Sequence, residues 1–217
     1  MRQLIYIILV MIVAATPAFP GTISFIIGSV KIKSQANWMN AEPGMKIVNG
    51  DTIKTMKKSL AIVELINGSV VKLYPNTTFT FNAGAQQGGG AILDLAEGSV
   101  FAKIRKMPGG TNFSIKHQTV VASVRGTLFY FALQKKLLQS DDLWICVKEG
   151  AIDVKETVKS ESVTVKEGEG ILIKGARTIT PPKVYEWTKK LDWNMDPSKG
   201  PVIGHPVLKG EEFSPVY

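Results

Sequence analysis

The chain has 217 residues and a formal net charge of +8, a length that suits one hydrophobic core with a tail. Its single cysteine, Cys146, excludes an intramolecular disulfide and lies in an apolar stretch that favours a buried structural thiol. No dense basic run is present, which favours solvated strand faces over a nucleic-acid interface. The lysines of the first third are instead scattered: Lys31, Lys33, Lys54, Lys57, Lys58 and Lys72.

Residues 1–18 are predicted to form a signal peptide. Arg2 supplies a positive start, Leu4 to Ala15 is continuously apolar, and Thr16-Pro17-Ala18 offers small residues for cleavage. The apolar run of about 16 residues is shorter than the roughly 20 that a spanning helix needs. This favours cleavage over an uncleaved membrane anchor, although the anchor stays open. We therefore expect an exported protein, periplasmic or at the cell surface, with no stable membrane span after cleavage.

Residues 22–176 are predicted to form an all-β domain, because no helical periodicity precedes residue 181. Strong turn signals separate short apolar strands, as at Asn49-Gly50-Asp51. In Leu60–Leu73, a strict two-residue hairpin would place Val63 opposite Lys72 and mix the two faces. We therefore expect a bulged or offset turn there.

A weak repeat of strand, glycine, small residue and branched apolar residue runs through this domain. Its copies are Gly28-Ser29-Val30, Gly68-Ser69-Val70, Gly98-Ser99-Val100 and Gly150-Ala151-Ile152. Their irregular spacing argues against a strict solenoid period. The pattern predicts a jelly-roll-like sandwich or a short β-helical stack of short strands.

Val120–Leu133 is predicted to be one long strand, because β-branched and aromatic residues crowd it without a proline. Arg125 falls on its mixed face and Gly126 on its apolar face, where a neighbouring strand could approach closely. We expect Arg125 to pair with an acidic residue of an adjacent strand, either Glu149 or Asp51.

Residues 177–217 are predicted to form a tail. A short amphipathic helix over residues 183–193 is expected to begin after Pro182, and an extended or disordered segment is expected from Asp196 on. The helix would place three apolar residues on one side, where they could dock on the β core: Val184, Trp187 and Leu191.

The chain is poor in groups that converge for catalysis. Its two histidines, His117 and His205, and its one cysteine do not match a zinc pattern, and no nucleophile motif is present. We expect no catalytic site, no metal, no cofactor and no enzymatic activity. A carboxylate pair that meets only in space, as in a hydrolase of cell-wall sugars, stays open.

Several short motifs occur in a characteristic order over residues 45–174. They are Gly50-Asp51-Thr52-Ile53-Lys54-Thr55, Gly68-Ser69-Val70, Leu93–Val100, Val124-Arg125-Gly126-Thr127, Val147-Lys148-Glu149-Gly150 and Gly168-Glu169-Gly170. Together they resemble the FecR domain, an extracytoplasmic all-β module of bacteria. The resemblance marks family-signature residues that we expect to be structural: Gly50, Asp51, Gly68, Ser69, Val124, Arg125, Gly126, Thr127, Glu149 and Gly150.

The resemblance implies a role in the bacterial cell envelope. FecR regulators carry a signal from an outer-membrane receptor to a sigma factor, and they have a cytoplasmic segment before a transmembrane helix. Here the apolar run starts at Leu4, so direct control of a sigma factor is not expected. The main hypothesis is an exported, non-enzymatic binding module for an envelope protein or polysaccharide. The alternative is a periplasmic regulator that relays an external cue with a membrane partner. The sequence does not set the oligomeric state or the membrane that the protein faces.

Overall fold

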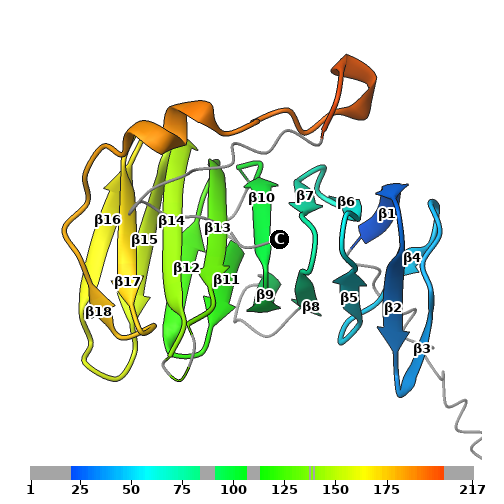
Figure 1. Ribbon diagram of the computed structural model, residues 1–217, viewed down its shortest axis with the longest axis horizontal. Helices are drawn as coiled ribbons and strands as arrows, with labels where there is room; N and C mark the ends of the chain where they lie inside the picture. Colours follow the sequence, from blue (N-terminus) through cyan, green and yellow to red (C-terminus); the bar gives the residue numbers. More distant parts are fainter. Residues whose placement is uncertain (1–20, 84–90, 107–112, 137, 139, 203–217) are drawn as a thin grey trace, which may run out of the picture.

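The computed structural model describes residues 21–83, 91–106, 113–136, 138 and 140–202, which form a sandwich of two nine-stranded β-sheets (Figure 1). Sheet A has the order β18 (Thr178–Ile179), β17 (Gly170–Lys174), β14 (Asp142–Glu149), β13 (Leu128–Gln134), β10 (Ser99–Lys103), β7 (Val70–Leu73), β6 (Leu60–Leu65), β1 (Gly21–Ile27) and β4 (Lys46–Ile47). Sheet B has the order β16 (Ser162–Lys166), β15 (Ala151–Glu156), β12 (Val120–Val124), β11 (Phe113–His117), β9 (Ala91–Glu97), β8 (Thr78–Ala83), β5 (Thr52–Thr55), β2 (Val30–Ser34) and β3 (Asn37–Asn40). The expected all-β sandwich is confirmed.

The chain advances along the sandwich from one end to the other, so the colours in Figure 1 run in sequence order from blue to yellow. Hairpins alternate between the sheets: β6–β7 lies in sheet A, β8–β9 in sheet B, and β13–β14 again in sheet A. Strands β9 and β11 run parallel, and the other neighbouring pairs of the described strands run antiparallel. Apart from β1 and β6, paired strands are therefore at most three places apart in chain order.

Glycines mark the points where the chain crosses between sheets. Gly28, Gly98, Gly126 and Gly150 each occupy a crossing and have φ values of 71°, 86°, 66° and 85°. Residues with a Cβ rarely adopt this left-handed region, which glycine enters without steric cost. Three copies of the weak repeat are therefore sheet crossings, while the copy at Gly68 is the β6–β7 turn.

The β6–β7 hairpin confirms the expected offset turn. Val63 lies opposite Val71, and Ile62 lies opposite Lys72. Gly68, with a φ of 75°, accommodates the extra residue that shifts the register. Val63 and Val71 both face the core as a result, and Lys72 points to the outer face of sheet A.

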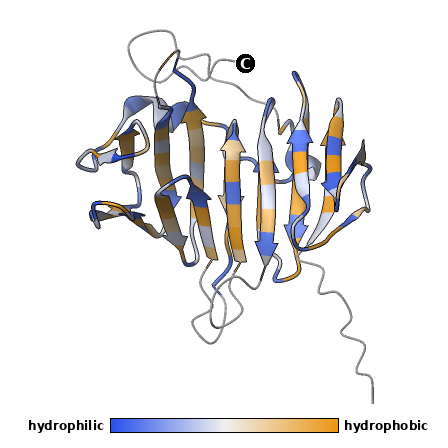
Figure 2. Ribbon diagram, turned by 90° about the horizontal axis from the view of Figure 1, so that it is seen from below, coloured by the Kyte–Doolittle hydropathy of each residue, from blue (hydrophilic) through white to orange (hydrophobic). Residues whose placement is uncertain are grey.

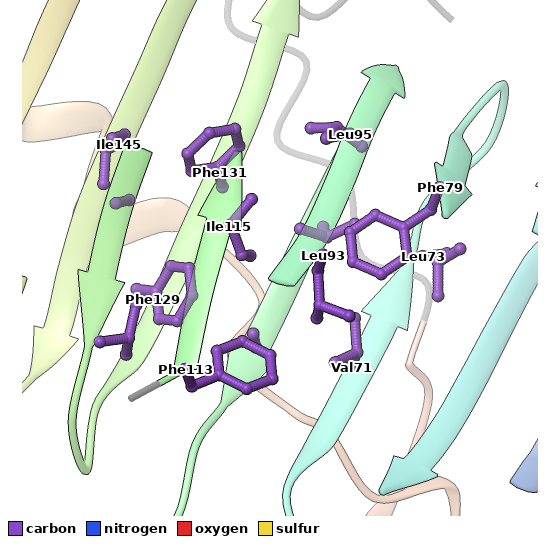
Figure 3. Packing of buried hydrophobic residues seen from close by; sticks show 14 of the residues in the cluster. Val71, Leu73, Phe79, Leu93, Leu95, Phe113, Ile115, Phe129, Phe131 and Ile145 are labelled. Carbon is purple, nitrogen blue, oxygen red and sulfur yellow. The ribbon is translucent and has the colours of Figure 1, made fainter. Parts of the chain in front are cut away.

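The core lies between the two sheets and is rich in phenylalanine. Phe79, Phe81, Phe113, Phe129 and Phe131 are at most 1% exposed, and Figure 3 shows four of them among branched aliphatic side chains. Burial of each such side chain contributes about 1.5–3 kcal/mol. Figure 2 shows hydrophobic and hydrophilic residues alternating along the strands, as a sheet with one buried face requires.

Two expectations about local structure are wrong. Val120–Leu133 is not one strand, because β12 ends at Val124 and β13 begins at Leu128 in the other sheet. The helix expected over residues 183–193 is a 3-10 turn, η2 (Glu186–Lys190), followed by η3 (Pro197–Lys199). Backbone hydrogen bonds between Gly170 and Lys183 hold the start of this segment extended, which prevents a longer helix.

The C-terminal segment nevertheless packs on the β core. Trp187 is 1% exposed and Leu191 is partly buried, as expected, whereas Val184 is 59% exposed. Among the described residues, no helix combines the length and hydrophobicity needed to cross a bilayer. The predicted signal peptide at residues 1–18 and His205 lie outside the described residues.

Candidate interaction sites at the arginine corner and the C-terminal strap

The signature residues near the first turns are tied into the backbone. Asp51 is 2% exposed, and its Oδ2 accepts a hydrogen bond of 2.8 Å from the Val48 N–H. Ser69 is fully buried, and its Oγ accepts a hydrogen bond of 3.0 Å from the Arg105 N–H. Gly50 has a φ of 89°, as its turn position requires. These contacts hold the loops in place.

The Arg-Gly-Thr motif forms a rigid crossing, which we call the arginine corner: residues 124–127 with Glu149 and Gly150. Thr127 is 2% exposed, and its hydroxyl donates a 2.9 Å hydrogen bond to the Ala151 carbonyl. Its backbone pairs in both directions with Ile104, at 2.8 and 3.1 Å. A Cβ at Gly150 would lie 2.8 Å from the Gly126 carbonyl oxygen, so the two crossings touch backbone to backbone.

Arg125 itself is exposed, and the expected ion pair is wrong. Asp51 lies beside β5, which is four strands from β12 in sheet B, so it cannot reach Arg125. In the part of the chain that the structure describes, no ion pair links Arg125 to Glu149. The corner thus holds its backbone tightly while the guanidinium points into solvent.

The corner carries charges of both signs. The methylene groups of Lys106 lie over Gly126, where an added Cβ would meet them at 3.2 Å or less. On the other side, the carboxylate of Glu167 accepts a hydrogen bond of 3.4 Å from the Gly150 N–H. Arg125 can therefore donate to a carboxylate of another molecule.

The second feature is the C-terminal strap, residues 183–202, which lies on the outer face of sheet A (orange in Figure 1). It is attached through aromatic side chains. The Trp187 ring lies 5.5 Å from that of Trp144 at an interplanar angle of 85°, and the Trp193 ring lies 5.0 Å from Phe101 at 85°. Edge-to-face contacts of this kind add about 0.5–1.5 kcal/mol each to area burial.

Lys72 lies beneath the strap and is fully buried. Its ammonium donates hydrogen bonds to the carbonyls of Asp192 at 3.2 Å, Asn194 at 2.5 Å and Val202 at 3.4 Å. It also lies 4.7 Å from the centroid of the Phe101 ring. Burial disfavours the charged form and lowers the pKa of Lys72 from 10.5 to about 8, although the charge of Asp192 opposes the shift.

The expectation that Lys72 belongs to the solvated lysines is therefore wrong. Lys72 is the one charged residue of β7, whose other residues are Val70, Val71 and Leu73. A single cation within such an apolar strand is the sequence feature that indicated its burial. The strap supplies the carbonyls that satisfy it, and these come from a segment distant in sequence.

Cys146 is 1% exposed, and burial raises the pKa of its thiol well above the usual value, so the expected buried structural thiol is confirmed. His117 is also buried, with Nδ1 2.7 Å from the Leu95 carbonyl oxygen. Within the described residues, no group of three or more histidine, cysteine, aspartate or glutamate side chains could hold a metal ion.

The fold defines a β-sandwich module built from two sheets. The family model FecR protein matches residues 51–169, more than half of the chain. The chain therefore belongs to the FecR protein family, and the resemblance seen in its motifs is confirmed.

Solved structures with a similar fold are also known. Two crystal structures of a candidate anti-sigma factor from Parabacteroides distasonis ATCC 8503, at 2.50 and 1.65 Å resolution, superpose with TM-scores of 0.51 and 0.50 at 16% sequence identity. Each match covers 61% of this chain and 59% of the solved chain. At this identity the likeness concerns the fold. Comparison with curated proteins gives no match.

Proposed function

We propose that this protein is a FecR-type signalling regulator that acts by binding another protein. The family match over residues 51–169 supports a regulatory role, and the solved structures of similar fold are of a candidate anti-sigma factor. Regulators of this family are associated with the cell envelope, in agreement with the export signal predicted at residues 1–18. This proposal takes up the alternative drawn from the sequence. It also retains a protein partner from the main hypothesis.

The observation that carries the proposal is the exposure of Arg125 on a fixed backbone. Thr127 and Gly150 hold the corner through close contacts, so binding here needs little ordering of the backbone. Arginine is enriched among the residues that contribute most to protein interfaces, and its planar fork binds carboxylates through two parallel hydrogen bonds. Arg125 accordingly contacts an acidic segment of the partner protein.

Deletion of the gene and complementation with variants test this function. Wild-type protein restores the transcript profile of the parent strain, whereas Arg125→Glu does not, because it places a carboxylate against an acidic partner. The matched control is Arg177→Glu, which makes the same charge change at an exposed position in the β17–β18 turn and should complement fully. An unchanged transcript profile after deletion would contradict a regulatory role. Failure of both variants would contradict the role of the corner.

A further inference from the structure

The outer face of sheet B carries polar residues in register. One row crosses all nine strands through directly opposed pairs, an extent of about 38 Å at 4.8 Å per strand. Its members are Trp38, Lys33, Thr52, Thr80, Asp94, Lys116, Val121, Lys155 and Ser162. Such a row offers a flat, continuous surface along the long axis of the sandwich.

The end of this face formed by β3, β2, β5 and β8 is cationic, and we call it the lysine face. Lys31 and Lys54 lie directly opposite each other, and Lys33 follows two residues along β2. The other outward-facing residues of these four strands are uncharged: Trp38, Asn40, Thr52, Thr78, Thr80 and Asn82. The four strands thus bring together three cations and no carboxylate of their own on this face, and the next outward-facing carboxylate along the row is Asp94 on β9, opposite Thr80.

The fold leaves this charge uncompensated. None of the three lysines has an ion-pair partner within the described residues. Like charges directly opposite each other in a sheet are destabilising. Lysines often protect an exposed sheet edge from pairing, but β2 and β5 are interior strands, so that role does not account for Lys31 or Lys54.

An exposed aromatic ring completes the surface. Trp38 lies on the edge strand β3 opposite Lys33, and it is 46% exposed although tryptophan side chains are highly buried on average. Farther along the same row, beyond Lys33, the hydroxyls of Thr52 and Thr80 lie 2.9 Å apart. A ring for stacking, ammonium groups and hydroxyls therefore share one flat face.

We propose that the lysine face binds an anionic polysaccharide, a linear glycan that carries carboxylate groups. The three ammonium groups attract the carboxylates, Trp38 stacks on the apolar face of a sugar ring, and the threonine hydroxyls bond to sugar hydroxyls. A flat face of interior strands suits an extended chain. Three cations are few for nucleic acid, which demands many phosphate contacts. Interface cores between proteins are depleted of lysine.

This inference goes beyond the proposed regulatory function, because it concerns another surface. Strand β2 is five positions from β12 in sheet B, about 24 Å away, so the lysine face and the arginine corner are separate. A protein that fails to bind glycan would therefore leave the complementation result of Arg125→Glu unaffected. Failure of the complementation test would likewise leave the glycan-binding result unaffected.

Native gel electrophoresis of the purified full chain through gels that contain polygalacturonate tests the proposal, with dextran gels as the neutral reference. Wild-type protein should be retarded by polygalacturonate alone. The triple variant Lys31→Gln/Lys33→Gln/Lys54→Gln should bind at least tenfold more weakly, and Trp38→Ala should also weaken binding. The matched control Lys148→Gln/Lys166→Gln/Lys174→Gln removes the same charge from exposed positions elsewhere and should stay within twofold of wild type.

Equal weakening in the control triple variant would overturn the proposal, because general charge would then explain binding. Equal retardation by dextran, no retardation of wild type, or tighter binding to duplex DNA or phosphatidylglycerol vesicles would overturn it as well. NMR chemical-shift mapping on the wild-type chain gives a second measurement that needs no variant. Shifts caused by polygalacturonate should fall on β3, β2, β5 and β8, and shifts centred on other strands would refute the assignment.

Discussion

The buried ammonium of Lys72 should make stability depend on pH in a defined window. Its pKa is about 8 in the folded protein and 10.5 when solvated, so between these values the unfolded chain binds more protons than the folded chain. The free energy of unfolding should therefore rise as the pH increases from 8 to 10.5, and this contribution is lost as the pH falls through 8. A shift of this size corresponds to about 3 kcal/mol at 1.36 kcal/mol per pKa unit.

Comparison with Lys72→Met isolates this effect, because other titrating groups cancel in the difference between the two proteins. Urea denaturation followed by tryptophan fluorescence is suitable, since Trp187 and Trp193 lie in the strap. The difference in the free energy of unfolding, wild type minus Lys72→Met, should rise by about 3 kcal/mol between pH 8 and 10.5. Lys174→Met, at an exposed position of sheet A away from the strap, should give a difference that stays flat. A flat difference for Lys72→Met would refute the reasoning that its ammonium is desolvated.

Three further outcomes are expected. Thr127→Val should lower the free energy of unfolding by about 0.5–1.5 kcal/mol, because it removes the hydrogen bond from a buried hydroxyl to the Ala151 carbonyl, whereas Arg125→Ala should change it by less than about 0.5 kcal/mol; equal effects in urea titrations would contradict the corner geometry. Lys31→Gln should raise stability by about 0.2–1 kcal/mol by relieving repulsion with Lys54, with a gain that shrinks in 1 M salt; a loss of stability would argue against repulsion. The carboxylate of Glu156 accepts a hydrogen bond from the Lys159 N–H, which is the main cause of its lowered pKa. The ionised carboxylate therefore stabilises the fold at neutral pH, and this contribution is lost in acid. The difference in the free energy of unfolding between wild type and Glu156→Gln should shrink on acidification, and a constant difference would contradict this.

Much of the fold follows from the sequence because its causes are local. Alternation with a period of two predicts strands, and glycine turn signals place their ends. The offset of the β6–β7 hairpin could be predicted because the simple register would have put Lys72 opposite Val63 in the core. The order of the signature motifs, including Val124-Arg125-Gly126-Thr127, identified the family for the same reason: each motif is a short segment with its own backbone requirement.

The candidate sites depend on contacts that sequence spacing does not reveal. Val120–Leu133 has the composition of one strand, but the chain crosses to the other sheet at Gly126, since Ile104 and Ala151 offer hydrogen-bond partners there. Burial of Lys72 depends on three carbonyls of the strap, from a segment far along the chain.

The sequence by itself therefore determined the all-β class, the turn positions and the family, because backbone preference and side-chain alternation act over a few residues. The tertiary structure alone decided which charges meet. Lysines that look scattered in the sequence were separated into one beneath the strap, Lys72, and three on a shared face, Lys31, Lys33 and Lys54. Strand register and sheet order bring these side chains together, and both are set by long-range hydrogen bonds and core packing.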